Sequence, residues 1–516
     1  MRMIDFFDRG ADIQGLRTCV RDSVVSLTYV QVRRASYQVA NALASLNARR
    51  ETRVAVYSPN SAYAFVAVMG VFRANCTWMP VNTRNTVEET QAYLADNACE
   101  VLMFHSTVAA QAREAAGAMN RPVRLVCLDR EVHGCESMQR WLETGDDTAH
   151  DVGGSEDEEA VVKSTGGTTG RSKSVLHTHR NMASMIANVL SCMHYTEPPV
   201  YLIAIPMTHG AGTIAMAMMT LGATLIMHER ADPARILDAF EHEGVTTTFF
   251  TPTVIYSLLG QPGVRQRRFP ALRHLVYGGA PMSADRLVEA IEVFGPVMAT
   301  CYGQVEALLI CTFMAPEEHL GADGRPDLAR LKSCGRKTPM TRVEIMDDAG
   351  KLLGPNEVGE IVVRGGQVMK GYYNNPEETA RVSRFGWHHT GDIGMRDDAG
   401  YFYIVDRMKD MIISGGFNIY PGEIEQVLWT HDAVHDCAVV GVPDEKWGES
   451  LLAIVQLKPG ASATTEELLA HCRASLSGMK TPRMLEIWDD LPRSDVGKVL
   501  KRSIRDKYWQ GRERSV

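Results

Sequence analysis

Short runs of apolar and β-branched residues alternate with longer segments of helical spacing through most of the first 300 residues. Each apolar run is four or five residues long, which is the length of a strand buried on both faces. The predicted strands are 53–57, 101–104, 125–128, 201–205, 246–250 and 274–277, and helical patterns between them include 62–74, 87–97 and 233–243. Such alternation predicts parallel strands covered by helices, so the expected fold class is α/β with a large N-terminal body of doubly wound sheets.

The pattern changes at about residue 335, where shorter strands are separated by glycine-rich turns. Residues 346–365 and 396–407 each predict an antiparallel hairpin, so 335–405 is expected to form a small β-rich lobe. After Arg407 a compact mixture of strands and helices returns. We therefore expect an N-terminal domain over 1–405 and a small α+β C-terminal domain over 406–516.

The longest uncharged apolar segment, residues 213–227, falls short of the ~20 residues that a membrane-spanning helix needs. It predicts a buried core helix that leads into a strand, and no stable membrane insertion. The first ten residues contain two arginines and two aspartates, which is unlike a signal peptide. We expect a cytoplasmic protein.

Composition narrows the class of protein further. The 516 residues are 45% hydrophobic and 22% charged, which is typical of a globular protein. A formal net charge of −8 argues against nucleic acid as a partner. The 11 cysteines form no CxxC pair and no zinc-ligand spacing, which fits reduced thiols in the cytosol.

The strongest candidate for chemistry is the segment KSTGGTTGRSKS, residues 163–174. Its glycines leave backbone amides uncovered, its threonines add hydroxyl donors, and Lys173 adds a positive charge, so it is suited to wrap a polyphosphate. It is expected to follow a strand at 160–162 and to precede a helix. It is not the common Walker A loop, because Lys173 lies three residues after Gly170 rather than directly after it.

With this loop the chain resembles the adenylate-forming superfamily, which includes acyl-CoA synthetases, luciferases and peptide-synthetase adenylation domains. The resemblance extends over nearly the whole chain. Further motifs in the family's order are PMTHGAG (206–212), LVYGGAPMS (275–283), YGQVE (302–306), GEIVVRG (359–365), WHHTGD (387–392), DRMKDMIISGGFNIYPGEIE (406–425) and LPRSDVGKVLKR (491–502). The resemblance implies an enzyme that joins a carboxylate to ATP, releases pyrophosphate, and passes the acyl group from the adenylate to a thiol.

The resemblance also implies an ATP site built from several motifs. Tyr302 would stack on adenine, and Asp392 would accept from the ribose hydroxyls with help from Arg407. The residues implied for ATP are Thr165, Gly166, Gly167, Thr168, Thr169, Gly170, Lys173, Gly279, Ala280, Pro281, Tyr302, Gly303, Asp392 and Arg407.

Four residues match positions with catalytic roles in the family. Lys498 would bridge the carboxylate and the α-phosphate and neutralise charge in the transition state. Glu306 would help to hold Mg²⁺, with Thr168 nearby, and His209 would guard the acyl pocket. Lys409 would be the hinge on which a mobile C-terminal domain turns between two poses.

The two remaining sites hold the acid and the thiol. Gly415 and Gly416 would open a narrow channel for the pantetheine of coenzyme A. The acyl pocket is expected at His209, Gly210, Ala211, Val276, Gly278, Cys301, Gln304, Val305 and Leu308. Because this set carries no aspartate for an α-amino group, we expect a hydrophobic acid: fatty, aryl or polycyclic. ATP, Mg²⁺ and coenzyme A are the implied co-substrates and cofactor.

Three positions depart from the family's pattern: Val305 replaces a hydroxyl residue, and Ser172 and Ser174 replace the usual proline and glycine. We favour the complete reaction, and an enzyme that retains one half-reaction is the alternative. A carrier protein as thiol acceptor, a luciferase-type oxygenase and a non-catalytic nucleotide-binding regulator also stay open, as does homo-oligomer formation.

Overall fold

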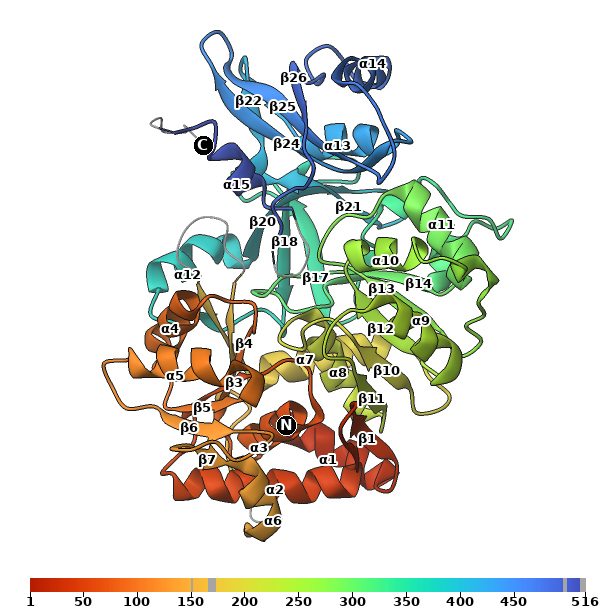
Figure 1. Ribbon diagram of the computed structural model, residues 1–516. Coiled ribbons are helices and arrows are strands. Elements are labelled where there is room, and N and C mark those ends of the chain that lie inside the picture. Colours follow the sequence, from red (N-terminus) through yellow and green to blue (C-terminus); the bar gives the residue numbers. More distant parts are fainter. Residues whose placement is uncertain (150–151, 166–172, 495–498, 511–516) are drawn as a thin grey trace.

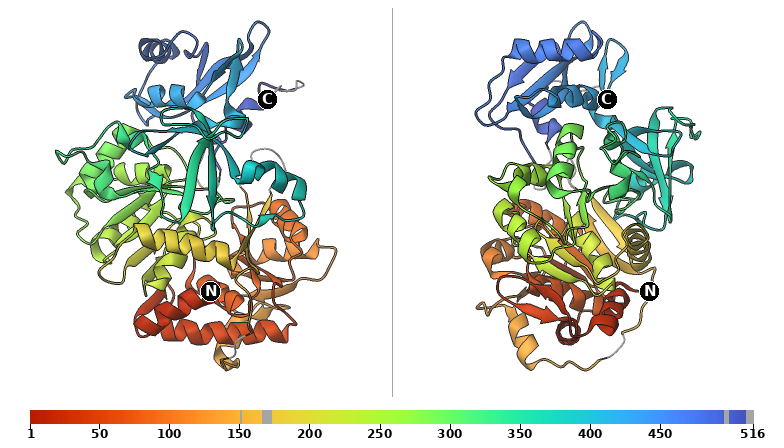
Figure 2. Two further views of the ribbon diagram at one scale, coloured as in Figure 1. Left: turned by 180° about the vertical axis from the view of Figure 1, so that it is seen from behind. Right: turned by 90° about the vertical axis from the view of Figure 1, so that its right-hand side faces the viewer.

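The computed structural model describes residues 1–149, 152–165, 173–494 and 499–510. Two large sheets and the helices around them form the lower body in Figure 1, a third small sheet lies above them, and the C-terminal unit forms the top. The side view in Figure 2 shows the C-terminal unit at one end of the molecule, beyond both large sheets.

The first large sheet has eight strands, and its central strands are parallel. At one side of this sheet, β9 pairs antiparallel with both β8 and β19. From edge to edge the strands are β19 (Gly371–Tyr372), β9 (Ser174–Thr178), β8 (Glu159–Ser164), β4 (Thr77–Val81), β3 (Arg53–Tyr57), β5 (Val101–Phe104), β6 (Arg124–Cys127) and β7 (Glu136–Ser137).

The second large sheet has nine strands and is also parallel at its centre. Antiparallel strands close both of its sides. From edge to edge the strands are β16 (Arg336–Lys337), β15 (Thr312–Met314), β14 (Met298–Tyr302), β13 (His274–Tyr277), β12 (Thr247–Phe250), β10 (Val200–Ile203), β11 (Thr224–Met227), β1 (Thr18–Arg21) and β2 (Ser26–Thr28).

A layer of apolar helices joins the two sheets into one core. Helix α7 (His179–Cys192) packs on β8 and β9, helix α8 (Gly210–Thr220) packs on β10, β11 and β12, and the two helices contact each other. Helix α8 is buried from Ala211 to Thr220, because apolar residues surround its whole circumference. The other helices of the body are α1 (Met3–Gln14), α2 (Tyr29–Ser45), α3 (Ala62–Arg73), α4 (Val87–Asp96), α5 (Ala109–Gly117), α6 (Met138–Thr144), α9 (Pro233–His242), α10 (Pro252–Leu259), α11 (Ala284–Phe294) and α12 (Pro376–Val382).

The small third sheet is an antiparallel meander of β17 (Thr341–Met346), β18 (Gly359–Gly365), β20 (His388–Arg396) and β21 (Phe402–Arg407). A short 3₁₀ turn, η6 (Met408–Asp410), then leads into the C-terminal unit. That unit contains β22 (Ile412–Ser414), β23 (Phe417–Ile419), α13 (Pro421–Trp429), β24 (Val434–Asp444), β25 (Gly448–Leu457), α14 (Thr465–Ser475), β26 (Met484–Ile487) and α15 (Lys501–Arg505).

The sequence pattern predicts most of these elements correctly. The strands expected at 53–57, 101–104 and 274–277 have the observed bounds, and the other three differ by one or two residues at an end. The apolar segment 213–227 is confirmed as a core helix leading into a strand. The α/β fold class with a β-rich lobe and a small α+β unit is confirmed as well.

One local prediction is wrong. The glycine-rich loop does not lead from a strand into a helix, because β8 and β9 are the two arms of a hairpin and Ser164 lies opposite Ser174. Strand β9 is five residues long and is followed without a break by α7, so its pattern merges with the helical pattern after it. Among the described residues, no helix has the length and apolar character that a membrane crossing requires.

Candidate functional site

The ends of β14 and β21 meet the middle of β20 in a polar network centred on Asp392. Its carboxylate accepts hydrogen bonds from Tyr302 Oη and from Gln304 Nε2, both at 2.7 Å, through Oδ2. Arg407 Nε lies 3.1 Å from Oδ1. Antiparallel pairing of β20 with β21 places Asp392 directly opposite Arg407, and Tyr302 is the last residue of β14. The residues expected for adenine and ribose therefore lie next to one another, although they are far apart in the sequence.

The Asp392 and Tyr302 side chains of this network are buried, and burial changes the pKa of Tyr302. Asp392 is 3% exposed and Tyr302 is 8% exposed. Burial first, and then the neighbouring Asp392 carboxylate, raise the pKa of the Tyr302 phenol well above its usual value, so the phenol stays a hydrogen-bond donor. Arg407 pairs with the Asp392 carboxylate, and a carboxylate is a suitable acceptor for the vicinal hydroxyls of a ribose.

Gln304 lies on this nucleotide side of the site. Its amide donates to Asp392 and also to the Thr390 carbonyl oxygen, at 2.9 Å. The sequence analysis placed Gln304 in the acyl pocket, but its side chain is engaged with the Asp392 network. Gln304 lies two residues after Tyr302, the last residue of β14, so alternation along an extended chain places both side chains on the same side. Its hydrogen bond to Asp392 depends on where β20 lies, which the local sequence does not indicate.

The residues expected for the adenine side follow neighbouring parallel strands. Gly279, Ala280 and Pro281 follow the end of β13 after one intervening residue, and Gly303 comes directly after β14. Gly279 has φ +81°, which favours glycine there, and a Cβ on Gly303 would lie 3.0 Å from the backbone of Leu309. The carboxyl ends of adjacent parallel strands meet at one edge of the sheet, which is where α/β proteins bind ligands.

On the phosphate side, Lys173 and Glu306 are both held through Tyr372. Tyr372 Oη donates to Glu306 Oε1 at 2.9 Å, and Lys173 Nζ lies 5.0 Å from the centre of the Tyr372 ring. Lys173 also forms an ion pair with Glu378. Arg381 and Lys173 lower the pKa of Glu378 to about 2, so Glu378 is an anion at neutral pH. Tyr372 and Glu378 were not predicted, because nothing in their local sequence indicates that β19 and α12 pack beside β9.

Two hydrogen bonds join the two ends of the phosphate loop, Thr165 and Lys173. The Thr165 amide donates to the Lys173 carbonyl oxygen at 2.9 Å, and the Lys173 amide donates to Thr165 Oγ1 at 3.2 Å. Between these ends, the predicted residues Gly166, Gly167, Thr168, Thr169 and Gly170 lie outside the described residues, and so do Ser172 and Lys498.

The expected acyl pocket is organised by an aromatic ring that the sequence analysis missed. A Cβ on Gly210 would lie 2.8 Å from the Phe249 ring, and a Cβ on Gly278 would lie 3.3 Å from it. The glycines of two separate motifs therefore flank one side chain, which is 5% exposed. The other predicted members Ala211, Val276, Cys301 and Leu308 are buried in the same apolar core.

Val305 lies apart from the Phe249 group. It packs against Val175, Met369, Tyr372 and Val382, on the side of the first sheet. Its backbone oxygen accepts a hydrogen bond from His177 Nε2 at 2.7 Å. The replacement of a hydroxyl residue by Val305 is therefore matched by apolar packing around it.

His209 lies at the start of α8 and is partly buried. Asn82 Nδ2 is 3.2 Å from its Nε2 atom. Burial first, and then the positive charges of Lys163 and Arg84, lower the pKa of His209 to about 4. The imidazole is consequently neutral at physiological pH and acts as a hydrogen-bonding group rather than as a cation.

The segment around Lys409 joins the β-rich lobe to the C-terminal unit. Lys409 is the middle residue of η6, and burial followed by the charge of Arg407 lowers its pKa. Asp406 Oδ2 accepts from the Gly422 amide at 2.7 Å, and Arg505 Nη1 lies 3.5 Å from Asp410 Oδ1. The first contact joins β21 to α13, and the second joins η6 to α15, at the base of the C-terminal unit in Figure 1.

Gly415 and Gly416 form the turn of the β22–β23 hairpin. Both have positive φ, +59° and +81°, and a Cβ on Gly415 would lie 2.6 Å from the Trp447 ring. Phe417 is 55% exposed beside them. In Figure 1, β22 lies in the upper part of the C-terminal unit, whereas β13 and β14 lie in the middle of the molecule.

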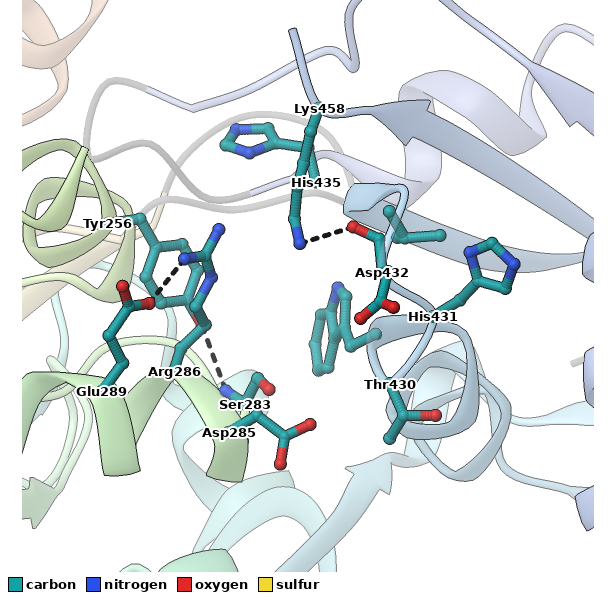
Figure 3. Close-up of a pocket in the computed structure, with 12 residues that line it drawn as sticks. Tyr256, Ser283, Asp285, Arg286, Glu289, Thr430, His431, Asp432, His435 and Lys458 are labelled. Atoms are coloured by element: carbon teal, nitrogen blue, oxygen red, sulfur yellow. Dashed lines mark hydrogen bonds and ion pairs between the residues drawn. The ribbon is translucent and has the colours of Figure 1, made fainter. Parts of the chain in front are cut away.

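A separate cavity of about 170 Å³ lies between the body and the C-terminal unit. Figure 3 shows Tyr256 and Arg286 on one side, facing His435 and Lys458 on the other. Arg286 pairs with Glu289, and Lys458 Nζ donates to a backbone oxygen, so the cations of this cavity are already engaged. Of the residues predicted for ATP, acid or thiol, none of those that the structure describes lines this cavity.

Comparison with known proteins agrees with this geometry. Residues 7–373 match the AMP-binding enzyme family, and residues 423–498 match the AMP-binding enzyme C-terminal domain. The chain is 35% identical over 496 residues to a feruloyl-CoA synthase of an Amycolatopsis species, covering 95% of this chain and 96% of the relative. It is 32% identical over 499 residues to the fatty acid–[acyl-carrier-protein] ligase ScoC of Streptomyces coeruleorubidus, covering 95% and 93%. The solved structure of ATP-bound MatB from Rhodopseudomonas palustris matches with a TM-score of 0.88 at 27% identity, covering 98% of this chain and 99% of that one.

Proposed function

Because this chain belongs to the AMP-binding enzyme family of adenylate-forming ligases, we propose that it activates a hydrophobic carboxylic acid with ATP and transfers the acyl group to coenzyme A. The carboxylate oxygen attacks the α-phosphorus of ATP, and pyrophosphate leaves. The thiolate of coenzyme A then attacks the acyl carbon of the adenylate, and AMP leaves.

The observation that carries the nucleotide part of this proposal is the buried Asp392 network. Tyr302 and Arg407 fix the carboxylate of Asp392 before a ribose binds. Asp392 therefore loses little side-chain conformational entropy on binding. Lys173 supplies positive charge for the phosphates. Lys498, at the position of the family's catalytic lysine, would neutralise the charge that develops between the two anionic reactants.

Glu306 fits a magnesium ion in the manner usual for nucleotide enzymes. Mg²⁺ takes one or two protein carboxylates and completes its shell with phosphate oxygens and water. Tyr372 engages one carboxylate oxygen of Glu306 and thereby sets the direction of the other. When bound, the ion would offset negative charge on the phosphates. Thr168 is the second proposed ligand.

The apolar surroundings of Phe249 support a hydrophobic acid. Gly210 and Gly278 contribute no side chain beside this ring, and Ala211 and Val276 are uncharged. An acyl chain or an aryl group that packs there would gain about 25 cal/mol for each Å² of apolar surface removed from water. An acid with an additional charged group on its acyl part would have to bury that charge beside Phe249, which is unfavourable.

Coenzyme A is the proposed thiol acceptor, with Gly415 and Gly416 lining its channel after the C-terminal unit has turned at Lys409. A relative that uses an acyl carrier protein supports the second candidate, transfer to a carrier. The enzyme is incubated with Mg-ATP and a panel of fatty, aryl and polycyclic acids, and pyrophosphate and thioester are measured with coenzyme A or a carrier protein. Acid-dependent pyrophosphate release with thioester formed on coenzyme A is the expected result. Thioester formed on the carrier alone would contradict the proposed acceptor.

A further inference from the structure

Lys163 is a buried cation that the reaction described above does not use. It lies on β8 directly before the phosphate loop and is 6% exposed. A buried ammonium is costly unless an anion or several hydrogen bonds compensate it. Among the described residues, Nζ has one hydrogen-bond partner, Thr213 Oγ1 at 3.0 Å, and no ion pair. The energetic cost of this buried ammonium suggests that Lys163 has a role other than stabilising the fold.

Thr213 connects Lys163 to the acid side of the site. Thr213 Oγ1 donates to the His209 carbonyl oxygen at 3.1 Å, so its hydrogen is committed and its lone pair accepts from Lys163. The Thr213 amide donates to the same carbonyl oxygen at 3.1 Å. Lys163 therefore fixes the first turn of α8, which carries both His209 and Gly210.

His177 is a second buried group in the same cluster. It is fully buried, and among the described residues its Nδ1 atom has no hydrogen-bond partner, while Nε2 donates to the Val305 carbonyl oxygen. Val161 pairs with His177 and Lys163 pairs with Val175 across the hairpin, so Lys163 and His177 project from the same face of the sheet. The cluster joins the base of the phosphate loop, the start of α8 and the loop that carries Glu306.

We propose that Lys163 is a positioning residue for the carboxylate of the acid substrate, acting through Thr213 and His209. Its ammonium orients the first turn of α8 and adds positive potential at the imidazole beside which the carboxylate enters. Arg84 adds to the same potential, since its charge also acts on His209. The inference rests on the proposed adenylation, in which an anionic acid must approach an anionic polyphosphate.

The decisive experiment is steady-state pyrophosphate release by wild type, Lys163→Met and Thr213→Val, with acid and ATP varied in turn. Loss of a hydrogen bond that involves a charge predicts about a tenfold rise in KM for the acid. We expect KM for ATP to stay within about twofold, because the Asp392 network is untouched. Thr213→Val retains the cation and breaks the connection to His209, so it should reproduce the rise in KM for the acid. Lys332→Met, at an exposed lysine, is the matched control.

The outcomes separate the two proposals. Equal rises in KM for acid and ATP, or a Lys163→Met variant that is as active as wild type, would overturn the positioning role alone. A fall in Tm that accompanies the loss of activity would assign Lys163 to folding and would also overturn it. Wild type that releases no pyrophosphate with any acid would overturn the proposed function, and the inference with it.

Discussion

Replacement of Lys163 by methionine should stabilise the protein, and the gain should depend on pH. Methionine has nearly the same length and keeps the apolar contacts of the lysine stem, but it carries no charge. Burial lowers the pKa of Lys163 from 10.5 to about 8, and no carboxylate opposes this effect. At neutral pH the folded protein therefore carries the cost of a desolvated ammonium.

The size of that cost follows from the two pKa values. Each pKa unit corresponds to 1.36 kcal/mol, so the buried cation costs about 3 kcal/mol at pH 7. Between pH 8 and pH 10.5 the unfolded chain binds more protons at this position than the folded chain, so wild-type stability rises with pH in that window. The advantage of the variant should fall to about 1 kcal/mol at pH 9.5.

Urea unfolding followed by tryptophan fluorescence at pH 7 and pH 9.5 tests both the sign and the pH dependence. Lys332→Met is the control, and its unfolding midpoint should match wild type at both pH values because this lysine is exposed. A Lys163→Met variant that is less stable than wild type at pH 7 would refute the reasoning. It would mean that the hydrogen bond to Thr213 outweighs the cost of burying the charge.

Three further substitutions probe the other parts of the site. Asp392→Asn keeps the shape of the side chain but removes the charge, so KM for ATP should rise roughly tenfold to a hundredfold with little change in KM for the acid; an unchanged KM for ATP would contradict the ribose role. Lys409→Pro should leave pyrophosphate release intact and abolish thioester formation, and equal loss of both steps would contradict a hinge. Phe249→Leu should shift acid preference towards bulkier acids at a stability cost of about 1–3 kcal/mol; an unchanged preference across the acid panel would remove Phe249 from the acyl pocket.

The sequence predicts this fold well because its strands are continuous apolar runs bounded by turn residues. Strand β3 was predicted with its observed bounds for that reason, whereas β9 merged with the helical pattern of α7. A five-residue strand that is followed at once by a helix has no boundary signal of its own. Only its pairing with β8, a tertiary event, distinguishes it.

The candidate site divides in the same way. Tyr302, Asp392 and Arg407 stand in ordered motifs, and the structure brings their side chains into contact. Phe249 and Glu378 belong to no such motif. Phe249 matters because it packs between Gly210 and Gly278. Glu378 matters because it forms an ion pair with Lys173. Sequence patterns predict the backbone and the motifs, but the neighbours that complete a site depend on how distant strands and helices meet.

The buried charge of Lys163 illustrates the same limit. On β8 it interrupts an apolar run, which in a sequence resembles the polar end of a strand leading into a loop. The structure places its ammonium inside the core against Thr213 of another element. A lysine next to a glycine-rich loop would ordinarily be taken as exposed, and only the position of α8 shows otherwise.

We propose that this chain joins a carboxylic acid to ATP and that Lys498 is the catalytic cation. The most direct measurement is acid-dependent pyrophosphate release from Mg-ATP by wild type and by Lys498→Ala, with binding of ATP measured in parallel. We expect wild type to release pyrophosphate only when the acid is present. Lys498→Ala should lose at least about a hundredfold of this activity and bind ATP nearly as well as wild type. Release by Lys498→Ala at the wild-type rate would show that Lys498 is not the catalytic cation.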